Sequence, residues 1–312
     1  MGLNRFLPGG GGARGNTDWE GEPSLRRSES RSTHSLLGCA ARVICGYDAA
    51  PPSGATRLLP GTIKKPVISI QYSGALPAAV VAIVFALLAR VVRAVSDGGA
   101  LAGVVIAFLL ISAGGLAGFV PLLVVFLLTL VATRWRGDRK RNIGVAEHRG
   151  GRRASQVLAN LGATGLCAAA AVIFRRHAGT LMVGGMAALA EAAADTVSSE
   201  IGQAVCAQPR LILGFEPAPA GTNGAMSLEG TLAGCIAASI VAWSSSFSNI
   251  LPLRWSPVVA LAGTAGMFLD SILGAALENP GWLGNDSVNF VSTVFAADLA
   301  LMVMLVAGNT GR

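Results

Sequence analysis

The sequence predicts an all-α membrane protein, a polytopic bundle of about seven or eight transmembrane helices behind a polar N-terminal leader. Composition is the first reason, because 52% of the 312 residues are hydrophobic and 13% are charged, about half the charged share of a soluble domain. Distribution is the second reason, because the apolar residues gather in runs close to the roughly 20 residues that cross hydrocarbon. This pattern excludes a globular protein with a single core.

The leader covers residues 1–70 and is rich in Gly, Ser, Arg and Pro. It contains no apolar run long enough to cross a membrane, and its composition predicts an unstructured segment. Arg and Ser are also typical of organelle transit peptides, but acidic residues in the leader do not fit the acid-poor composition of such peptides. A transit-like segment and a simple extension therefore both stay open. These acidic residues include Asp18, Glu20, Glu22 and Glu29.

The transmembrane domain is expected at residues 74–307 and contains eight apolar runs. The second run is short, and Gly114 and Gly115 separate it from the third, which predicts a tight hairpin or a re-entrant pair. Gly and Ala are frequent in the runs and suit close helix packing in lipid, and Gly230 and Gly234 have the GxxxG spacing of a packing contact. The runs are 74–92, 99–113, 115–133, 156–174, 179–199, 228–250, 257–278 and 287–307.

The loop at 134–155 sets the orientation, because it holds eight Arg or Lys residues. The positive-inside rule places this loop on the cytoplasmic side, or on the stromal side in a plastid. Arg175 and Arg176 are a weaker signal for the opposite orientation. A bacterial inner membrane is the expected location, and a plastid envelope also fits. The loops expected on the same side as 134–155 are 93–98, 200–227 and 279–286.

The net charge of +7 fits this topology and also an attraction to anionic lipids or phosphorylated substrates. Nucleic acid is not an expected partner, because the basic residues lie in the leader and in short loops with little aromatic interleaving. The five cysteines and three histidines show neither a CxxC pair nor a Cys/His spacing, so the sequence does not indicate a zinc site.

The fifth run, with "ALAEAAADTVSSEIG" at 188–202, places carboxylates where lipid is expected. Glu191, Asp195 and Ser198 are spaced four and three apart and share one helix face, whereas Glu200 lies about half a turn away from that face. A carboxylate in hydrocarbon costs about 3 kcal/mol unless it is paired or bound. We expect Asp195 to bind Mg²⁺, because hard oxygens suit a cation that bridges phosphates. An interhelical salt bridge and a solvated helix end are the alternatives.

The seventh and eighth runs repeat this pattern. In "MFLDSILGAALE", Asp270, Gly274 and Glu278 are spaced four apart and share a face. In "NDSVNF", Asn285 and Asn289 lie one turn apart. Because Asn and Asp often cap the starts of helices, capping is the alternative to a ligand-binding role for Asn285 and Asp286.

A Gly-rich turn and a basic segment are the candidate phosphate-binding elements. In "GTNGAMSLEGTLAG" at 221–234, a turn leads to a Ser that can cap the next helix, whose first turn holds a Glu. Backbone N–H groups at a helix start favour anions, although capping and close packing explain the motif equally well. It is not a Walker loop. The residues concerned are Gly221, Gly224, Ser227 and Glu229.

The basic segment is "GVAEHRGGRRASQVLANLG" at 144–162. Arg149, Arg152 and Arg153 could clamp a nucleotide or lipid phosphate, because the guanidinium fork suits phosphate oxygens. Membrane orientation and contact with anionic headgroups are the alternative. Gln156 and Asn160, one turn apart, are expected to line the same site.

Five blocks of this sequence resemble, in the same order, an integral membrane family known as domain of unknown function 92. The family includes a plastid phytyl-phosphate kinase, and the resemblance covers roughly residues 75–307. The resemblance implies phosphoryl transfer from CTP or another nucleoside triphosphate to a prenyl monophosphate. The blocks are "GVAEHRGGRRASQVLAN", "ADTVSSEIG", "GTNGAMSLEGTLAG", "DSILGA" and "NDSVNF".

The residues and the resemblance together predict a site for phosphoryl transfer, which depends on positioning, metal ions and positive charge. Mg²⁺ is the expected cofactor, and the nucleotide and the prenyl phosphate are the expected substrates. The predicted catalytic residues are Asp195, Glu200 and Asp270, and the predicted Mg²⁺ ligands are these three and Asp286. The residues predicted to bind substrate or phosphate are Arg149, Arg152, Arg153, Asn160, Ser198, Gly221, Gly224, Ser227, Glu229, Asn285 and Asn289.

A small-solute or ion transporter is the alternative function, with the carboxylates serving as proton or cation sites. A transport path predicts polar residues on both sides of the membrane midplane. Here the predicted topology gathers them at one end, which favours an enzyme that works at the membrane surface.

Overall fold

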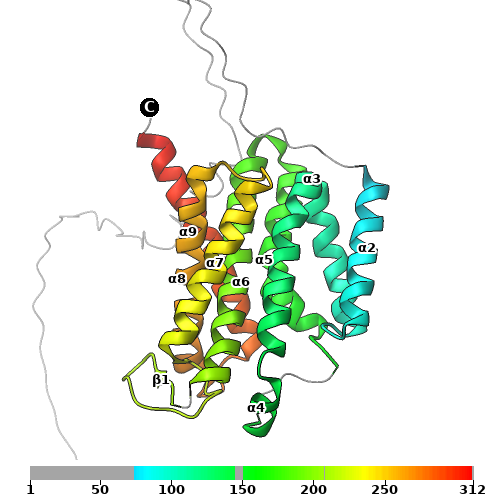
Figure 1. The fold of residues 1–312 in the computed structure, drawn as a ribbon. Coiled ribbons are helices and arrows are strands. Elements are labelled where there is room, and N and C mark those ends of the chain that lie inside the picture. Colours follow the sequence, from blue (N-terminus) through cyan, green and yellow to red (C-terminus); the bar gives the residue numbers. More distant parts are fainter. Residues whose placement is uncertain (1–73, 145–149, 207, 311–312) are drawn as a thin grey trace, which may run out of the picture. The chain divides into compact units, whose positions relative to one another are not determined.

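The computed structural model describes residues 74–144, 150–206 and 208–310, so the predicted leader at 1–70 and Arg149 lie outside the described residues. The described residues form a bundle of helices that run up and down beside one another (Figure 1). The α-helices are α2 (Ala75–Val91), α3 (Asp97–Arg134), α4 (Gly137–Asn142), α5 (Ala154–Ile173), α6 (Ala178–Val205), α7 (Leu228–Phe247), α8 (Ser256–Leu273) and α9 (Asn285–Thr310).

Short elements complete the bundle. Two 3₁₀ turns precede α6 and α8, and one π-helical turn extends α8. A two-stranded antiparallel sheet, with Arg210 opposite Met226, closes the loop between α6 and α7. These elements are η1 (Arg175–His177), η2 (Leu253–Trp255), η3 (Gly274–Glu278), β1 (Arg210–Leu211) and β2 (Ala225–Met226).

The element α3 is a hairpin of two helices, as the two adjacent glycines predict. Gly115 has a left-handed backbone, with φ 62° and ψ −159°, where the chain reverses. A Cβ atom on Gly118 would lie 2.5 Å from the carbonyl oxygen of Leu110, which is possible only if the two halves run side by side. A straight helix of 38 residues would measure about 57 Å, far more than a bilayer core of about 30 Å. The eight predicted runs are therefore confirmed as helical segments.

Five helices of the described chain are long and apolar enough to cross a membrane, namely α3, α5, α7, α9 and the segment of α8 with its flanking turns. The helix α2 is apolar but shorter. The helix α6 is the centre of the bundle instead, because it packs against α3, α5, α7, α8 and α9. Its neighbours shield it from lipid.

Small residues allow this close packing around α6. A Cβ atom on Gly263 of α8 would lie 2.8 Å from the Cβ of Ala190, and one on Gly234 of α7 would lie 2.8 Å from the carbonyl oxygen of Ala194. Gly230 approaches the carbonyl oxygen of Ser198 in the same way, at 2.6 Å. The GxxxG spacing on α7 is therefore a packing contact, as predicted.

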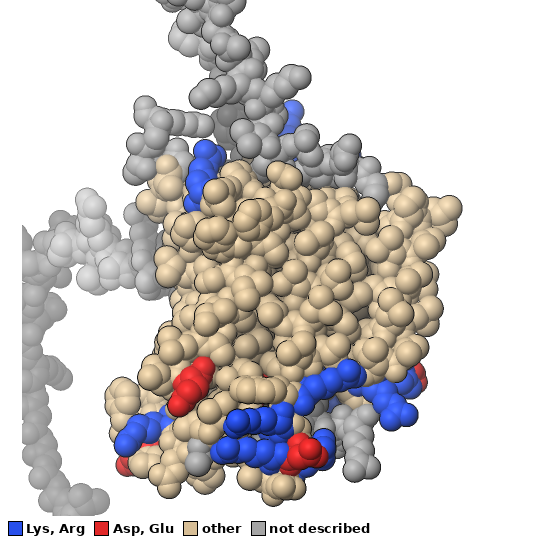
Figure 2. Space-filling model, viewed as in Figure 1, with Lys and Arg blue, Asp and Glu red and all other residues tan. Residues whose placement is uncertain are grey.

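Charged residues gather at one end of the bundle, which the space-filling view shows at the bottom, while the middle is almost free of them (Figure 2). Hydrogen bonds join the loops at this end. Arg134 donates to the carbonyl of Val92, and Asn279 Nδ2 donates to the carbonyl of Asn223 at 3.0 Å. The loops predicted to share one side of the membrane thus lie together. We call this end, which carries α4 and the loops at 92–96, 208–227 and 279–284, the basic end.

Candidate functional site

A cavity of about 360 Å³ lies at the basic end, between α5, α6, α8, α9 and the loop that precedes α7. Carboxylates, amides, hydroxyls and one guanidinium line most of it, and we call it the polar cavity. Eleven of the residues predicted from the sequence lie in its wall. They are Arg152, Asn160, Asp195, Ser198, Glu200, Gly221, Gly224, Ser227, Asp270, Asn285 and Asn289.

Two carboxylates from separate helices meet in this wall. Asp195 comes from α6 and Asp270 from α8, and both side chains are half-buried. They are close enough for their charges to interact. Glu278, two turns beyond Asp270 on the same face, lies in the same wall. Because like charges repel strongly where water is scarce, this arrangement favours a bound cation.

A hydrogen-bond network fixes the carboxylate of Asp270. Ser292 Oγ donates to Oδ2 of Asp270 at 3.2 Å. With its amide turned so that both polar atoms have suitable partners, Asn289 donates to the same oxygen at 3.1 Å and accepts from Asn160 Nδ2 at 3.2 Å. Asn160 and Asn289 are both buried. The network therefore holds a carboxylate in one orientation, as a metal ligand or a phosphate-facing group requires.

Glu191 lies one helical turn deeper than Asp195 and does not line the cavity. Its side chain is 1% exposed, and its Oε1 has no hydrogen-bond partner among the described residues. It interacts electrostatically with both Asp195 and Asp270. A buried carboxyl with one oxygen left without a partner is costly, so a proton or a cation must accompany this group of three acids.

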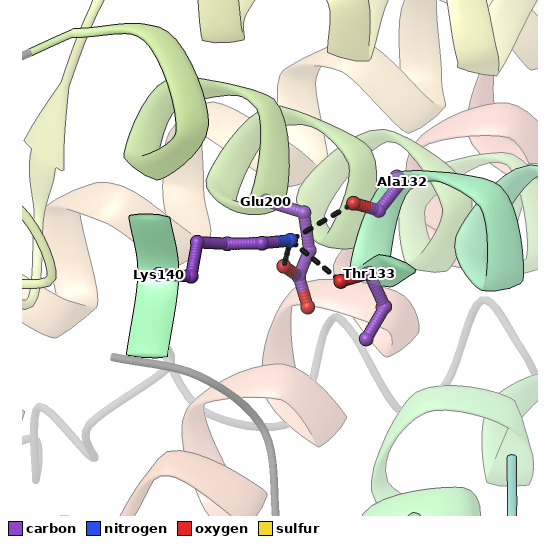
Figure 3. Close-up of polar contacts among 4 residues, drawn as sticks. All are labelled: Ala132, Thr133, Lys140 and Glu200. Carbon is purple, nitrogen blue, oxygen red and sulfur yellow. Dashed lines mark hydrogen bonds and ion pairs between the residues drawn. The ribbon is translucent and has the colours of Figure 1, made fainter. Parts of the chain in front are cut away.

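Glu200 has a partner that the sequence did not reveal. Lys140 of α4 reaches into the bundle with a side chain that is 1% exposed, and its Nζ lies 2.6 Å from Oε2 of Glu200 (Figure 3). The same Nζ donates to the carbonyl oxygens of Ala132 at 3.0 Å and Thr133 at 2.7 Å. These carbonyls belong to the last turn of α3, where a helix leaves its acceptors without intrahelical partners.

The ion pair thus connects three helices at the basic end, α3, α4 and α6. The helix α6 continues past Glu200 to Val205, so Glu200 lies within the helix and not at its end. One of its oxygens is engaged with Lys140. Any metal-binding role of Glu200 would depend on the other oxygen alone.

The Gly-rich turn closes the cavity from the side of the loop. Gly224 has φ +72°, and a Cβ atom there would lie 2.5 Å from the carbonyl oxygen of Ser271, so the turn packs directly on the end of α8. Ser227 caps α7 as predicted, with Oγ accepting from the Gly230 N–H at 3.1 Å. The N-terminus of α7 therefore lies beside the cavity, where its backbone dipoles favour an anion.

Arg152 supplies the positive charge of the cavity wall. Its backbone is held by two hydrogen bonds, from its N–H to the carbonyl of Ala94 and from the Ser96 N–H to its carbonyl, both 3.0 Å long. Gln156 and Asn160 follow on α5 and line the same wall, as predicted. The loop between α2 and α3 thus anchors Arg152 beside the carboxylates.

Three predicted residues of the described chain lie outside the cavity wall. Arg153 and Glu229 are exposed, Arg153 directly after Arg152 and Glu229 two residues after Ser227, both of which line the wall. Asp286 faces an apolar groove with Ser287 and Phe290, because it lies next to Asn285 and therefore on another face of α9. Several other residues at or beside the site were not predicted from the sequence. These are Lys140, Thr222, Asn223, Ser271 and Ser292.

The four predicted metal ligands do not form one cluster. Among the residues that the structure describes, no group of three or more His, Cys, Asp or Glu side chains is arranged to hold a metal ion. Mg²⁺ is often bound through one or two carboxylates, with phosphate and water completing the shell. Asp195 and Asp270 fit that kind of site, and Asp286 does not reach it.

Comparison with known proteins identifies relatives in plants, cyanobacteria and archaea. Protein VTE6, chloroplastic, of Arabidopsis thaliana is 32% identical over 212 residues, which are 64% of this chain and 64% of that protein. An uncharacterized membrane protein of Synechocystis is 31% identical over 193 residues, 60% of this chain and 74% of the relative. One of Methanocaldococcus jannaschii is 29% identical over 222 residues, 70% of this chain and 90% of the relative. The chain thus spans slightly less than two thirds of the plastid relative's length. No solved structure matches.

A family model described as integral membrane protein DUF92 matches residues 80–297. The match begins within α2 and ends within α9, so it includes the whole wall of the polar cavity. The chain is an integral, multi-pass membrane protein, and it belongs to the DUF92 family.

Proposed function

We propose that the polar cavity binds a nucleoside triphosphate with Mg²⁺ and transfers its terminal phosphoryl group to a prenyl monophosphate at the membrane surface. The observation that carries this proposal is the pairing, in one cavity, of two carboxylates from separate helices with an arginine and a helix N-terminus. Phosphoryl transfer requires these elements, because its catalysis is mostly positioning and charge neutralisation.

The carboxylates have distinct tasks in this proposal. Asp195 and Asp270 would hold Mg²⁺, which supplies charge neutralisation between the phosphates when it is bound. Asn289 and Ser292 orient Asp270 through their hydrogen bonds to Oδ2. Glu200, held by Lys140, fixes the last turns of α6 relative to α4.

The phosphates of the nucleotide have their own partners. Arg152 offers two or more N–H donors in a fork that matches phosphate oxygens. The turn from Gly221 to Gly224 and the start of α7 offer further backbone N–H groups at the cavity. No strong general base is required, because the accepting phosphate is already an anion.

The identity of the acceptor is supported by relatedness. The chain is related to Protein VTE6, chloroplastic, and it resembles a family that includes a plastid phytyl-phosphate kinase. A prenyl chain can remain in the bilayer while its phosphate reaches the basic end. CTP is the proposed phosphoryl donor.

The test is a transfer assay with the purified protein in detergent, γ-labelled CTP, Mg²⁺ and geranylgeranyl monophosphate. The wild type is expected to form labelled diphosphate, and Asp195→Asn is expected to lose this activity. Glu216→Gln is the matched control, because Glu216 is an exposed carboxylate in the loop between α6 and α7 and lies outside the cavity wall. Lack of transfer with any nucleotide, or full activity of Asp195→Asn, would remove the basis of the proposal.

A cation or proton transporter is the second candidate, and Glu191 is the observation that favours it. This carboxyl lies deeper than the cavity and has an oxygen without a partner among the described residues, as an ion or proton relay within a membrane often does. Flux measurements in proteoliposomes under a pH or cation gradient separate the two functions. Flux that Glu191→Gln abolishes would favour transport, and transfer activity without flux would favour the enzyme.

A further inference from the structure

A second cavity of about 380 Å³ lies beside the polar cavity, between α2, both halves of α3 and α5. Apolar side chains form most of its wall, including Phe85, Phe126 and Leu161. Arginines lie at its basic end, among them Arg93 and Arg152. We call it the apolar cavity, and its combination of an apolar body with a cationic rim matches the chemistry of an amphiphile with an anionic head.

The two cavities share part of their walls. Arg152, Gln156 and Asn160 line both of them. Arg152 therefore lies where the two cavities meet, one lined by the acidic pair and the other mainly by apolar helix faces. A ligand whose anionic group reaches Arg152 from the apolar side would meet a second ligand bound in the polar cavity.

We propose that the apolar cavity is the acceptor site, which holds the single hydrocarbon chain of a lipid monophosphate and places its phosphate at Arg152. This inference rests on the proposed function, because it assigns the second substrate of that reaction to a place in the fold. A nucleotide and a lipid would then enter separate cavities and meet only at their phosphates.

The chemistry of the transfer is balanced in this arrangement. A non-bridging oxygen of the lipid phosphate forms a bond to the γ-phosphorus of CTP, and the bond from that phosphorus to the β,γ-bridging oxygen breaks. The electron pair leaves with CDP, and the product is the lipid diphosphate. No proton has to be removed from the attacking oxygen, because it is already an anion. The planar fork of Arg152 suits contact with phosphate oxygens on both sides.

The backbone around Arg152 is suited to this position. Its two hydrogen bonds to Ala94 and Ser96 tie it to the loop between α2 and α3, and these two elements form one side of the apolar cavity. Arg152 is the arginine that lies in both cavity walls.

Gly103 provides a way to fill the apolar cavity. It lies on the first half of α3 in the cavity wall, and a Cβ atom there would meet no other atom within 4 Å. Gly103→Phe therefore adds a ring toward open space and replaces a poor helix former. Leu101→Phe is the matched control, because Leu101 is on the same helix, is 68% exposed and lies outside the cavity wall.

The experiment uses the full-length protein in detergent and a geranylgeranyl monophosphate analogue with a diazirine on its chain. Irradiation and peptide mass spectrometry are expected to place cross-links on α2, α3 and α5 around Phe85, Phe126 and Leu161. Excess unlabelled geranylgeranyl monophosphate should suppress these cross-links, whereas excess phosphatidylcholine should not. Gly103→Phe should weaken lipid-phosphate binding by about tenfold, with CTP binding unchanged, and Leu101→Phe should bind both like the wild type.

Cross-links confined to the outer, lipid-facing surface of the bundle would overturn the inference, and so would equal competition by phosphatidylcholine, which would mean that any bilayer chain fills the cavity. Wild-type binding by Gly103→Phe would also overturn it. The two proposals fail in different ways. Specific lipid binding in the cavity without phosphoryl transfer contradicts the proposed function alone, and transfer that Gly103→Phe leaves intact contradicts the acceptor site alone.

Discussion

The polar cavity and the apolar cavity have nearly the same volume, about 360 and 380 Å³, but they are built from different parts of the helices. Helix ends and the turn before α7 form much of the polar cavity, where backbone N–H groups and carbonyls lack intrahelical partners. The apolar cavity is formed mainly by the bodies of helices, which present only side chains. In a membrane protein a polar site is therefore easiest to build at an end of the bundle, with an apolar site next to it at greater depth.

Replacement of Asp270 by Asn should distinguish the functions of the two cavities most clearly. The amide keeps the shape of the side chain but loses its charge, so we expect transfer activity to fall by about a thousandfold, the effect of several kcal/mol of metal-based stabilisation. Binding of the lipid phosphate should remain within about twofold. Steady-state kinetics and the lipid cross-linking assay measure the two effects.

Asp286→Asn is the matched control for this carboxylate. The sequence predicts both acids as metal ligands, but the structure places Asp286 outside the polar cavity. Its variant should keep wild-type transfer and the same dependence on Mg²⁺ concentration. An equal loss in both variants would mean that the cavity wall does not define the metal site.

Replacement of Lys140 by Met should weaken the structure that holds the cavities together. Lys140 joins Thr133, in the wall of the apolar cavity, to Glu200, in the wall of the polar cavity. Loss of one partner of a buried ion pair costs about 3–5 kcal/mol, and a lower midpoint of thermal unfolding in detergent would report it. The double variant Lys140→Met with Glu200→Gln should recover part of the loss, because no charge is then left unpaired. Failure of the double variant to recover any stability would contradict a direct pairing.

Gly224→Ala should affect the polar cavity alone. A methyl group there would meet the carbonyl of Ser271 at 2.5 Å, at a backbone angle that costs a side chain about 1–2 kcal/mol. We expect weaker CTP binding in equilibrium dialysis and a lower unfolding midpoint. Gly214→Ala is the control, because Gly214 also has a positive φ, +89°, but a Cβ atom there would meet no other atom within 4 Å. It should lose stability only and keep CTP affinity, and equal CTP affinity in both variants would exclude the turn from the nucleotide site.

Arg152→Lys should produce the smallest change and affect both cavities at once. Lysine keeps the positive charge but loses the planar fork, so we expect about tenfold weaker binding of both CTP and the lipid phosphate. Arg153→Lys, at an exposed position outside both cavity walls, should change neither. An effect on one ligand only would show that the residue serves a single cavity.

The architecture was largely predictable because bilayer thickness and helix geometry act on each segment separately. Run length and Gly114–Gly115 were enough to predict the eight segments and the hairpin within α3. Charge in the loops was enough to place the polar residues at one end. The four-residue spacing predicted that Asp270, Gly274 and Glu278 would share one helix face, and all three line the polar cavity.

The pairing between helices was not predictable in the same way, because helix periodicity does not fix how neighbouring helices are rotated. Lys140 was one of eight basic residues in a loop, and nothing in its spacing indicated that it would turn inward to Glu200. Asp286 and Asn285 are adjacent in sequence, but only the latter faces the cavity. Ser292, which orients Asp270, lies within an apolar run that has no motif around it.

The central position of α6 has a consequence for how the protein enters its membrane. The helix carries Glu191, Asp195 and Glu200, and it does not satisfy the length and hydropathy conditions that five other helices meet. Each acidic residue near the middle of a segment opposes insertion by about 3 kcal/mol when the translocon tests segments individually. We therefore expect α6 to leave the translocon together with α5 or α7, whose faces cover its carboxyl groups. For this protein, biogenesis and tertiary folding would then be a single event.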